Sequence, residues 1–273
     1  MIVDFHTHIF PDKVARGAVA SLASAANLPA YTDGTAAGLR AALKRAGVTV
    51  GVNLPVLTAP RQFEGVLRFA TELNAAFRGE GILSFAGVHP AQENIAAAMR
   101  AVREAGIRGV KIHPEYQDTF IDDEASYRLL AAAKSEGLIV VTHAGVDAAY
   151  RDRAVRCTPE RVARVLDRLG GFPELLLAHL GGAEMYGEVM AHLAGREVYF
   201  DTAFVLPDTS REQLLALIGR HGAERILFAT DSPWQDIAAE VARMRALALP
   251  TEDEARILYK NAAALLGLSG TAS

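Results

Sequence analysis

Two histidines, His6 and His8, follow the first apolar run of the chain. Because alternate side chains of a β-strand point to the same face, both imidazoles would leave the end of this strand in one direction. Imidazole is a frequent ligand of zinc-type ions, so such a pair supplies half of a metal site. A His-x-His pair alone is a weak signal, and its value depends on further ligands elsewhere in the chain.

Most of the other histidines also lie where a predicted strand ends. Six of the eight do so: His6, His8, His89, His113, His143 and His179. Asp231 closes the last predicted strand, and Lys111 shares a strand face with His113 two residues later. A single histidine in an apolar strand is usually a hydrogen-bonded core residue, but so many ligand types at strand ends together predict a metal site. His192 and His221 fall on helical stretches and are expected at the surface or at helix ends.

The elements that position these residues alternate regularly. Short apolar runs predict eight strands, at about residues 2–7, 49–54, 82–88, 107–113, 138–143, 174–179, 197–202 and 225–231. Stretches of helical period predict helices at about 35–46, 61–78, 91–105, 124–136, 158–169, 184–194, 210–220 and 235–247. This order predicts an α/β fold, a (β/α)₈ TIM barrel, with an open doubly wound sheet as the alternative. The carboxyl ends of barrel strands meet at one face, where such folds build active sites.

Two segments lie outside this alternation. Residues 9–34 are predicted to form a long loop after the first strand, as part of a lid or rim over the mouth of the barrel. Residues 251–267 are predicted to form an extra C-terminal helix, and residues 269–273 to be frayed. The length of the chain suits one barrel, so we expect residues 1–273 to form a single domain.

Composition limits the classes of partner. The net charge of −4 gives no sign of the basic patch that nucleic-acid binding requires, and charges interrupt the Ala-rich runs well before the roughly 20 apolar residues of a membrane span. The single cysteine, Cys157, excludes an intramolecular disulfide and suits a reducing compartment. We therefore expect a cytoplasmic protein with a small-molecule substrate. A homodimer is an open alternative, because symmetric dimers are common.

Six motifs along nearly the whole chain resemble the amidohydrolase superfamily, and within it the amidohydrolase-related (amidohydrolase-2) branch. They are Asp4-Phe5-His6-Thr7-His8, Gly109-Val110-Lys111-Ile112-His113-Pro114, Thr142-His143-Ala144-Gly145, Ala178-His179-Leu180-Gly181-Gly182, Ala229-Thr230-Asp231-Ser232-Pro233-Trp234 and Asn261-Ala262-Ala263. The resemblance implies a metal-dependent TIM barrel with one or two divalent ions, Zn²⁺ or another such as Mn²⁺. It implies four ligands for the first ion: His6, His8, His143 and Asp231.

The resemblance also implies catalytic roles. Asp231 would act as the general base toward a water whose pKa the ion lowers to about 7. His179 would either bind a second ion or act on the substrate. Lys111 has two readings that the sequence leaves open: a carboxylated lysine that bridges two ions, or a free lysine that faces the substrate.

Residues beyond the strand ends are candidates for substrate binding. His113 and Lys111 share one strand face, and Tyr116 and Trp234 lie on the loops that follow predicted strands. Arg151 belongs to a local positive cluster and is a candidate to bind a carboxylate, with a solvated loop as the alternative. A carboxylate is therefore one candidate feature of the substrate.

The resemblance favours a hydrolase that cleaves an amide, ester or lactone-type bond in a small organic molecule. The alternative is a metal-dependent non-oxidative decarboxylase, or hydratase, of an aromatic or unsaturated carboxylic acid. Such decarboxylases are generally longer than 273 residues, which favours hydrolysis. The deoxyribonuclease branch is a weaker candidate, because Lys111 stands where that branch has a glutamate.

Overall fold

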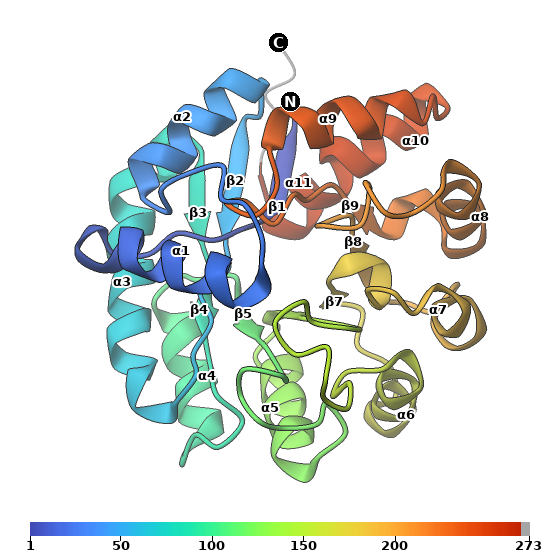
Figure 1. Ribbon diagram of the computed structural model, residues 1–273. Coiled ribbons are helices and arrows are strands. Elements are labelled where there is room, and N and C mark those ends of the chain that lie inside the picture. Colours follow the sequence, from blue (N-terminus) through green and yellow to red (C-terminus); the bar gives the residue numbers. More distant parts are fainter. Residues whose placement is uncertain (269–273) are drawn as a thin grey trace.

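Nine short strands, all paired in parallel, form the centre of the computed structural model, which describes residues 1–268 (Figure 1). They are β1 (Val3–Thr7), β2 (Val50–Asn53), β3 (Ile82–Ser84), β4 (Ala86–Gly87), β5 (Gly109–Ile112), β6 (Ile139–Thr142), β7 (Leu175–Leu177), β8 (Tyr199–Asp201) and β9 (Ile226–Leu227). Strands β1 to β3 form one sheet and β4 to β9 another. Each of the eight predicted strand segments contains a strand, and the segment 82–88 contains two, β3 and β4, on either side of Phe85.

Backbone hydrogen bonds join the two sheets into a closed barrel. The amide of Phe85, between β3 and β4, donates to the carbonyl of Asn53 at 2.9 Å. At the opposite seam the amide of Phe5 donates to Phe228 O at 3.0 Å, and Asp231 donates to His6 O at 2.8 Å. The (β/α)₈ barrel predicted from the sequence is therefore confirmed.

Eleven α-helices among the described residues surround the strands (Figure 1). They are α1 (Asp12–Ala26), α2 (Ala36–Ala46), α3 (Phe63–Phe77), α4 (Ile95–Glu104), α5 (Glu124–Ser135), α6 (Pro159–Leu169), α7 (Tyr186–His192), α8 (Arg211–His221), α9 (Ile237–Ala246), α10 (Thr251–Ala255) and α11 (Asn261–Leu266). A π-helical turn, Arg256–Lys260, joins α10 to α11, so the extra C-terminal helix is confirmed. The residues predicted to be frayed, 269–273, lie outside the described part. No helix in residues 1–268 is long and apolar enough to cross a membrane.

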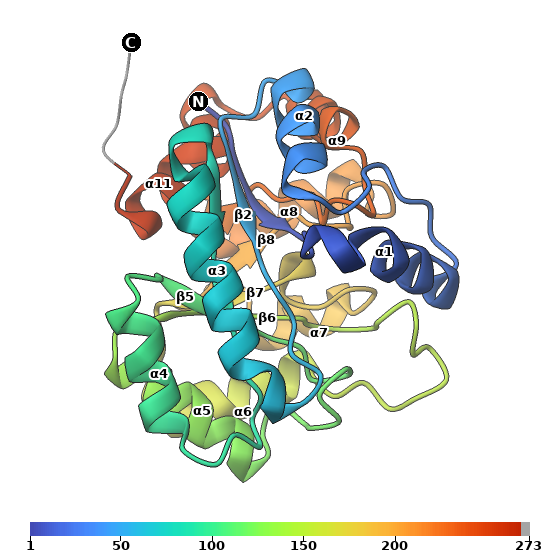
Figure 2. The ribbon, with the colours of Figure 1, turned by 90° about the vertical axis from the view of Figure 1, so that its left-hand side faces the viewer.

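The prediction of a long loop over residues 9–34 was wrong, because α1 occupies most of that segment. Its alanines are strong helix formers, and Asp12 adds a favourable charge to the first turn. Ala15 and Val19 are buried on one face, and Asn27 ends the helix in a left-handed conformation. Figure 1 shows α1 crossing in front of the barrel, and Figure 2 shows it on the side opposite α11.

Alternation along the strands divides the core in two. Ile139 and Val141 of β6 belong to a cluster drawn from strands around the barrel and from α11, whereas Val140 packs with the residues of the surrounding helices. Because the first cluster contains no residue of α1 to α10, it lies within the barrel. Strands buried on both faces explain the continuous apolar runs of the sequence.

His221 ends α8, as expected, but it is buried and not on the surface, with 1% of its area exposed. Its ring stacks on Phe200 with centroids 3.8 Å apart and planes 9° apart. Its Nε2–H donates to Val198 O at 3.0 Å, and its Nδ1 accepts from Gly195 N at 3.2 Å. Burial lowers the pKa of His221 to about 4.

We expect acid to destabilise the protein through His221. The unfolded chain binds the proton near pH 6.5 and the folded one near pH 4, so stability is complete above this window and falls as the pH decreases through it. Between pH 7 and 5 this linkage amounts to about 2 kcal/mol. Urea unfolding at both pH values checks it: His221→Gln should show a smaller loss than wild type, and equal losses would contradict the assignment.

Candidate active site

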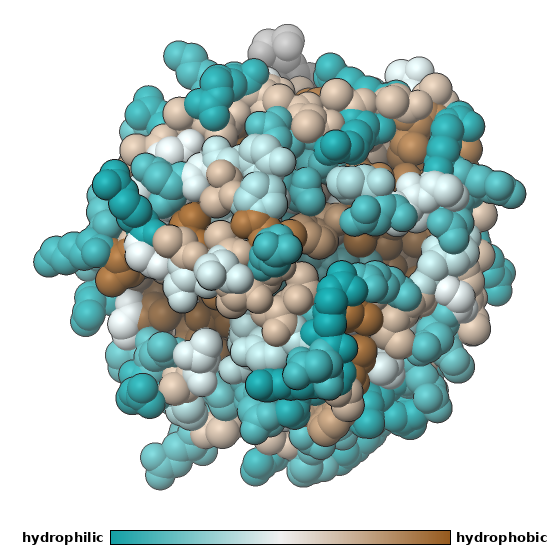
Figure 3. Space-filling view, in the orientation of Figure 1, coloured by the Kyte–Doolittle hydropathy of each residue, from teal (hydrophilic) through white to brown (hydrophobic). Residues whose placement is uncertain are grey.

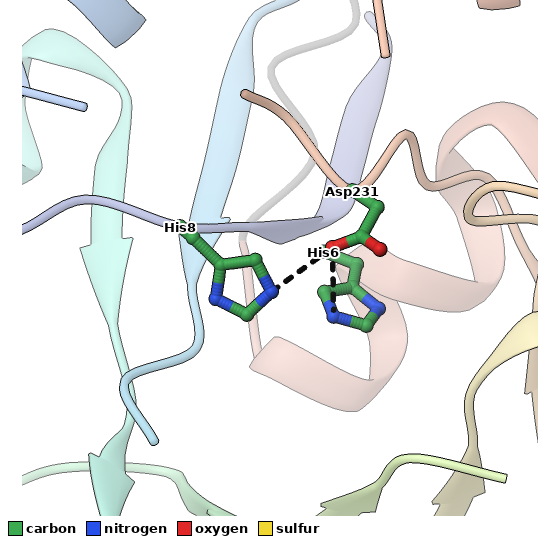
Figure 4. Close-up of side chains that lie close together, drawn as sticks. All are labelled: His6, His8 and Asp231. Atoms are coloured by element: carbon green, nitrogen blue, oxygen red, sulfur yellow. Dashed lines mark ion pairs between the residues drawn. The ribbon is translucent and has the colours of Figure 1, made fainter. Parts of the chain in front are cut away.

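His6, at the end of β1, His8 just beyond it and Asp231 after β9 point toward one another (Figure 4). His8 Nε2 lies 2.9 Å from Asp231 Oδ1, and His6 Nε2 lies 3.5 Å from the same oxygen. The backbone of Asp231 has a φ of 63°, a left-handed conformation that is uncommon for a residue with a side chain. The structure thus brings together three of the four residues predicted to bind the first ion.

Oxygen acceptors orient both imidazoles. His6 Nδ1 donates to Asp201 Oδ2 at 2.9 Å, and His8 Nδ1 donates to Leu54 O at 2.9 Å. Each ring therefore presents the lone pair of Nε2 to Asp231, the arrangement typical of histidines that ligate metals. Burial, followed by the charge of Lys111, holds the pKa of His6 well below its usual range and keeps its ring neutral.

The carboxylate of Asp231 is ionised and lacks a conventional hydrogen bond. Burial alone would raise the pKa of Asp231, whereas positive charge at His6 and His8 lowers it well below its usual range; with neutral rings, a bound cation would supply that charge. Its Oδ1 is buried and has no hydrogen-bond partner among the described residues. Two imidazole lone pairs and a carboxylate oxygen that meet without a proton between them fit a divalent cation, and these three residues could hold one.

A second group faces the same cavity. His113 Nε2 lies 3.4 Å from Asp147 Oδ2, and His143 Nε2 lies 4.0 Å from it. The rings of His113 and His143 stack with centroids 4.4 Å apart, and burial holds both their pKa values well below the usual range. Burial also raises the pKa of Asp147. This group, too, could hold a cation.

His179, just beyond β7, links the two groups. Its Nδ1 donates to Ala203 O at 2.9 Å, so its Nε2 accepts from His143 Nδ1 at 3.0 Å. Its amide donates to Asp201 Oδ1 at 2.8 Å, and its φ is 60°, again left-handed. His143 therefore lies beside His113 and Asp147, next to the cluster of His6, His8 and Asp231 and not inside it.

Lys111 is buried on β5, with 1% of its area exposed. Its Nζ donates to His6 Nε2 at 3.1 Å. Burial lowers the pKa of Lys111 to about 8, against the opposing charges of Asp201 and Asp231. With that pKa the amine is still mostly protonated at pH 7, and it lies directly beside the group formed by His6, His8 and Asp231.

Two predicted substrate contacts, Tyr116 and Trp234, line the cavity with His113 and Lys111. Tyr116 packs on His113 with ring centroids 4.1 Å apart. Arg151 is not brought to the cavity: its guanidinium is exposed and pairs with Glu184 through both terminal nitrogens. Arg151 thus pairs with a carboxylate of the protein itself, Glu184, where the sequence suggested that it would bind a carboxylate of the substrate.

Three acidic residues of the site were missed by sequence reasoning. Asp201 ends β8 and orients His6 and His179. Asp147 faces His113, and Glu115 Oε2 lies 3.7 Å from His113 Nδ1. A search for carboxylates within four residues of a predicted strand end would have found all three.

The cavity enclosed by these groups has a volume of about 600 Å³. Its floor carries the histidines, Lys111, Asp147 and Asp231, whereas its walls come from α1, α3 and the loops near them. Figure 3 shows apolar surface in the hollow beside α1. The site thus combines a polar floor, able to bind a cation and to exchange protons, with mostly apolar walls.

Comparison with known proteins gives a family model described as amidohydrolase, which matches residues 3–268. No curated protein matches. Solved structures do: 5-carboxyvanillate decarboxylase from Sphingomonas paucimobilis is 19% identical with a TM-score of 0.70 and covers 98% of this chain and 99% of its own. A 2,6-dihydroxybenzoate decarboxylase from Rhizobium is 17% identical with a TM-score of 0.71, covering 98% and 99%. An uncharacterised TIM-barrel protein from Bordetella bronchiseptica is 18% identical with a TM-score of 0.75, covering 97% and 98%.

Proposed function

We propose, because this chain belongs to the amidohydrolase family, that it is a metal-dependent hydrolase that cleaves an amide, ester or lactone-type bond in a small organic molecule. The observation that carries the proposal is that two carboxyl groups, Asp231 and Asp147, face one cavity, each beside histidines. Hydrolysis needs a base for the attacking water and an acid for the leaving group. Asp231 suits the role of the base and Asp147 that of the acid.

The divalent ion would be held by His6, His8 and Asp231, with His143 as the further ligand that the family resemblance implies. When bound, the ion acidifies a water and polarises the bond to be cleaved. Solved structures of a dihydroxybenzoic acid decarboxylase and a 5-carboxyvanillate decarboxylase are named as holding manganese, which supports a divalent ion without selecting zinc. The Lys111 ammonium donates to His6 Nε2, the atom that would bind the ion, so Lys111 must turn away or lose its proton as the ion binds.

The proton steps fall to side chains of this protein. Asp231, ionised at neutral pH, would accept the proton of the attacking water, whose acidity a bound ion would increase. Asp147, whose pKa burial raises, would return a proton to the leaving group directly or through His113, 3.4 Å away. Carboxyl groups whose pKa values are displaced in opposite directions are the usual sign of a base and an acid in one site. His179 would hold His143 through their shared hydrogen bond.

Isotope labelling tests the proposal. The manganese-loaded and the zinc-loaded protein are incubated in ¹⁸O-water with panels of lactones, esters, amides and aromatic carboxylic acids. Hydrolysis places one ¹⁸O in the acid product, which mass spectrometry detects. Turnover that releases carbon dioxide without this label would reject hydrolysis.

That second outcome would identify the alternative, a non-oxidative decarboxylase. Lys111 favours it, because it is the one lysine or arginine among the described residues that line the cavity. A free Lys111 ammonium beside His6 and Asp231 would bind a substrate carboxylate next to the ion. Four of the structurally similar proteins named here are decarboxylases by name, but at their low identity the likeness supports the fold alone.

We expect Asp201→Asn to weaken metal binding about 10-fold to 100-fold, because the amide no longer accepts well from His6 Nδ1. Its remaining oxygen can still accept from the amide of His179, so the fold should persist. Competition with a fluorescent chelator measures the affinity. Asp208→Asn, on the exposed surface, is the matched control, and equal affinities in both variants would contradict the role of Asp201.

A further inference from the structure

Above its polar floor, the cavity is walled by apolar side chains from two helices. Leu22 and Ala26 come from α1, and Val66 and Phe69 come from α3. Members of each pair are three or four residues apart, so that they share one helix face and present a continuous apolar surface. Trp234, beyond β9, adds an aromatic side chain to the lining.

The ionisable side chains of the lining are confined to the floor. They come from strand ends and the loops that follow: His6, His8, Lys111, His113, Tyr116, His143, Asp147, His179 and Asp231. The walls are lined by residues between positions 9 and 69, of which Thr58 and Gln62 have polar side chains. None of these wall residues, all of them in the described part of the chain, is charged. A charged substrate group at this level would lose its hydration without gaining a partner.

Phe204 lies at the border between floor and walls. Its ring centroid is 6.5 Å from that of His179, and it lines the cavity. Its φ is 67°, a strained left-handed conformation for a bulky residue. Strain of this kind persists where the surrounding structure imposes it, and ligand-binding positions are common among such places. The chain thus tolerates strain to hold this ring beside the floor.

We propose that the substrate has one polar, reactive end and an apolar aryl or alkyl arm, and that the arm occupies a subsite formed by Leu22, Ala26, Val66, Phe69, Phe204 and Trp234. The placement of the polar end rests on the proposed function. A volume of about 600 Å³ equals about 20 waters at roughly 30 Å³ each, more than a reactive end alone requires. The subsite selects against a substrate that carries a second carboxylate or a phosphate at its far end.

A series of 4-n-alkylbenzoates, from methyl to hexyl, tests the subsite by isothermal titration of the manganese-loaded protein. Affinity should rise about fourfold for each added CH₂ until the subsite is full. A benzoate with a carboxylate at the end of a 4-alkyl arm of the same length should bind at least about tenfold more weakly than its apolar counterpart. A series whose affinity does not change with arm length would overturn the proposal.

Two valine substitutions locate the arm. Val66→Asn should reduce the gain per CH₂ to less than about twofold, whereas Val14→Asn, on the exposed face of α1, should keep the wild-type gain. Circular dichroism verifies folding; if Val66→Asn does not fold, Leu22→Asn replaces it under the same criterion. A folded subsite variant with the full wild-type gain would overturn the assignment.

A chelator separates the subsite from the proposed function. If the metal site is wrong, removing the ion leaves every affinity unchanged while the gain with arm length persists. If the subsite is wrong, removing the ion weakens binding, and the series is flat both with and without it.

Discussion

We expect Asp231→Asn to abolish turnover while the barrel stays folded. The amide keeps the size of the carboxylate but removes the negative charge that meets the two imidazoles, and it cannot accept the proton of water. Both losses act on one step, so we expect kcat/KM to fall by at least about 10³-fold. Steady-state kinetics with the substrate identified by isotope labelling measures the loss, and circular dichroism verifies the fold.

Asp208→Asn makes the same chemical change on the exposed surface and should keep full activity. The comparison removes any general effect of losing one negative charge. If Asp231→Asn kept more than about a tenth of wild-type activity, neither its role as a ligand nor its role as a base could stand.

The barrel was predictable because its evidence is local. Runs such as residues 138–141 are apolar on both faces, and each is followed by helical periodicity, so the order of elements alone selects the architecture. The convergence of His6, His8 and Asp231 then follows from topology, since parallel strands end on one face. Neither inference needs the position of a single side chain.

The helix α1 was missed because its sequence pattern is ambiguous and its helical state is evident only from how it packs in the folded protein. An alanine-rich and glycine-containing segment is typical of a loop as well as of a helix. Its helical state depends on burying Ala15 and Val19 in the folded protein, a tertiary effect that the pattern of the segment does not show. The same helix supplies part of the cavity wall, so the shape of the cavity could not be predicted either.

The grouping of the histidines was also beyond sequence reasoning. The histidines of the site all lie at strand ends, but which ones share a cluster depends on rotamers and on the carboxylates that orient them. Asp201 lies 195 positions from His6 in the chain, and their hydrogen bond places the imidazole. His143 turns toward His113 and Asp147, a distinction of a few ångströms that strand order does not determine.

Removing divalent ions should have an effect as large as that of Asp231→Asn. The Nε2 atoms of His6 and His8 and the carboxylate of Asp231 are arranged for a cation, and Asp231 Oδ1 has no hydrogen-bond partner among the described residues. We expect dialysis against a chelator to reduce kcat by at least about 10³-fold, and manganese or zinc to restore it. A protein that stays fully active after its metal content has fallen below a tenth of an equivalent would contradict metal dependence.

The same titration has a readout that does not depend on turnover. An ion that binds only the folded state stabilises it by about 4 kcal/mol at 1,000 times its Kd, so the melting temperature should rise with metal concentration. Asp231→Asn should lose this rise together with its activity, whereas Asp208→Asn should keep it. Because catalysis and stability report on the same three residues by independent routes, a variant that lost activity but kept the full rise would assign Asp231 to proton transfer alone.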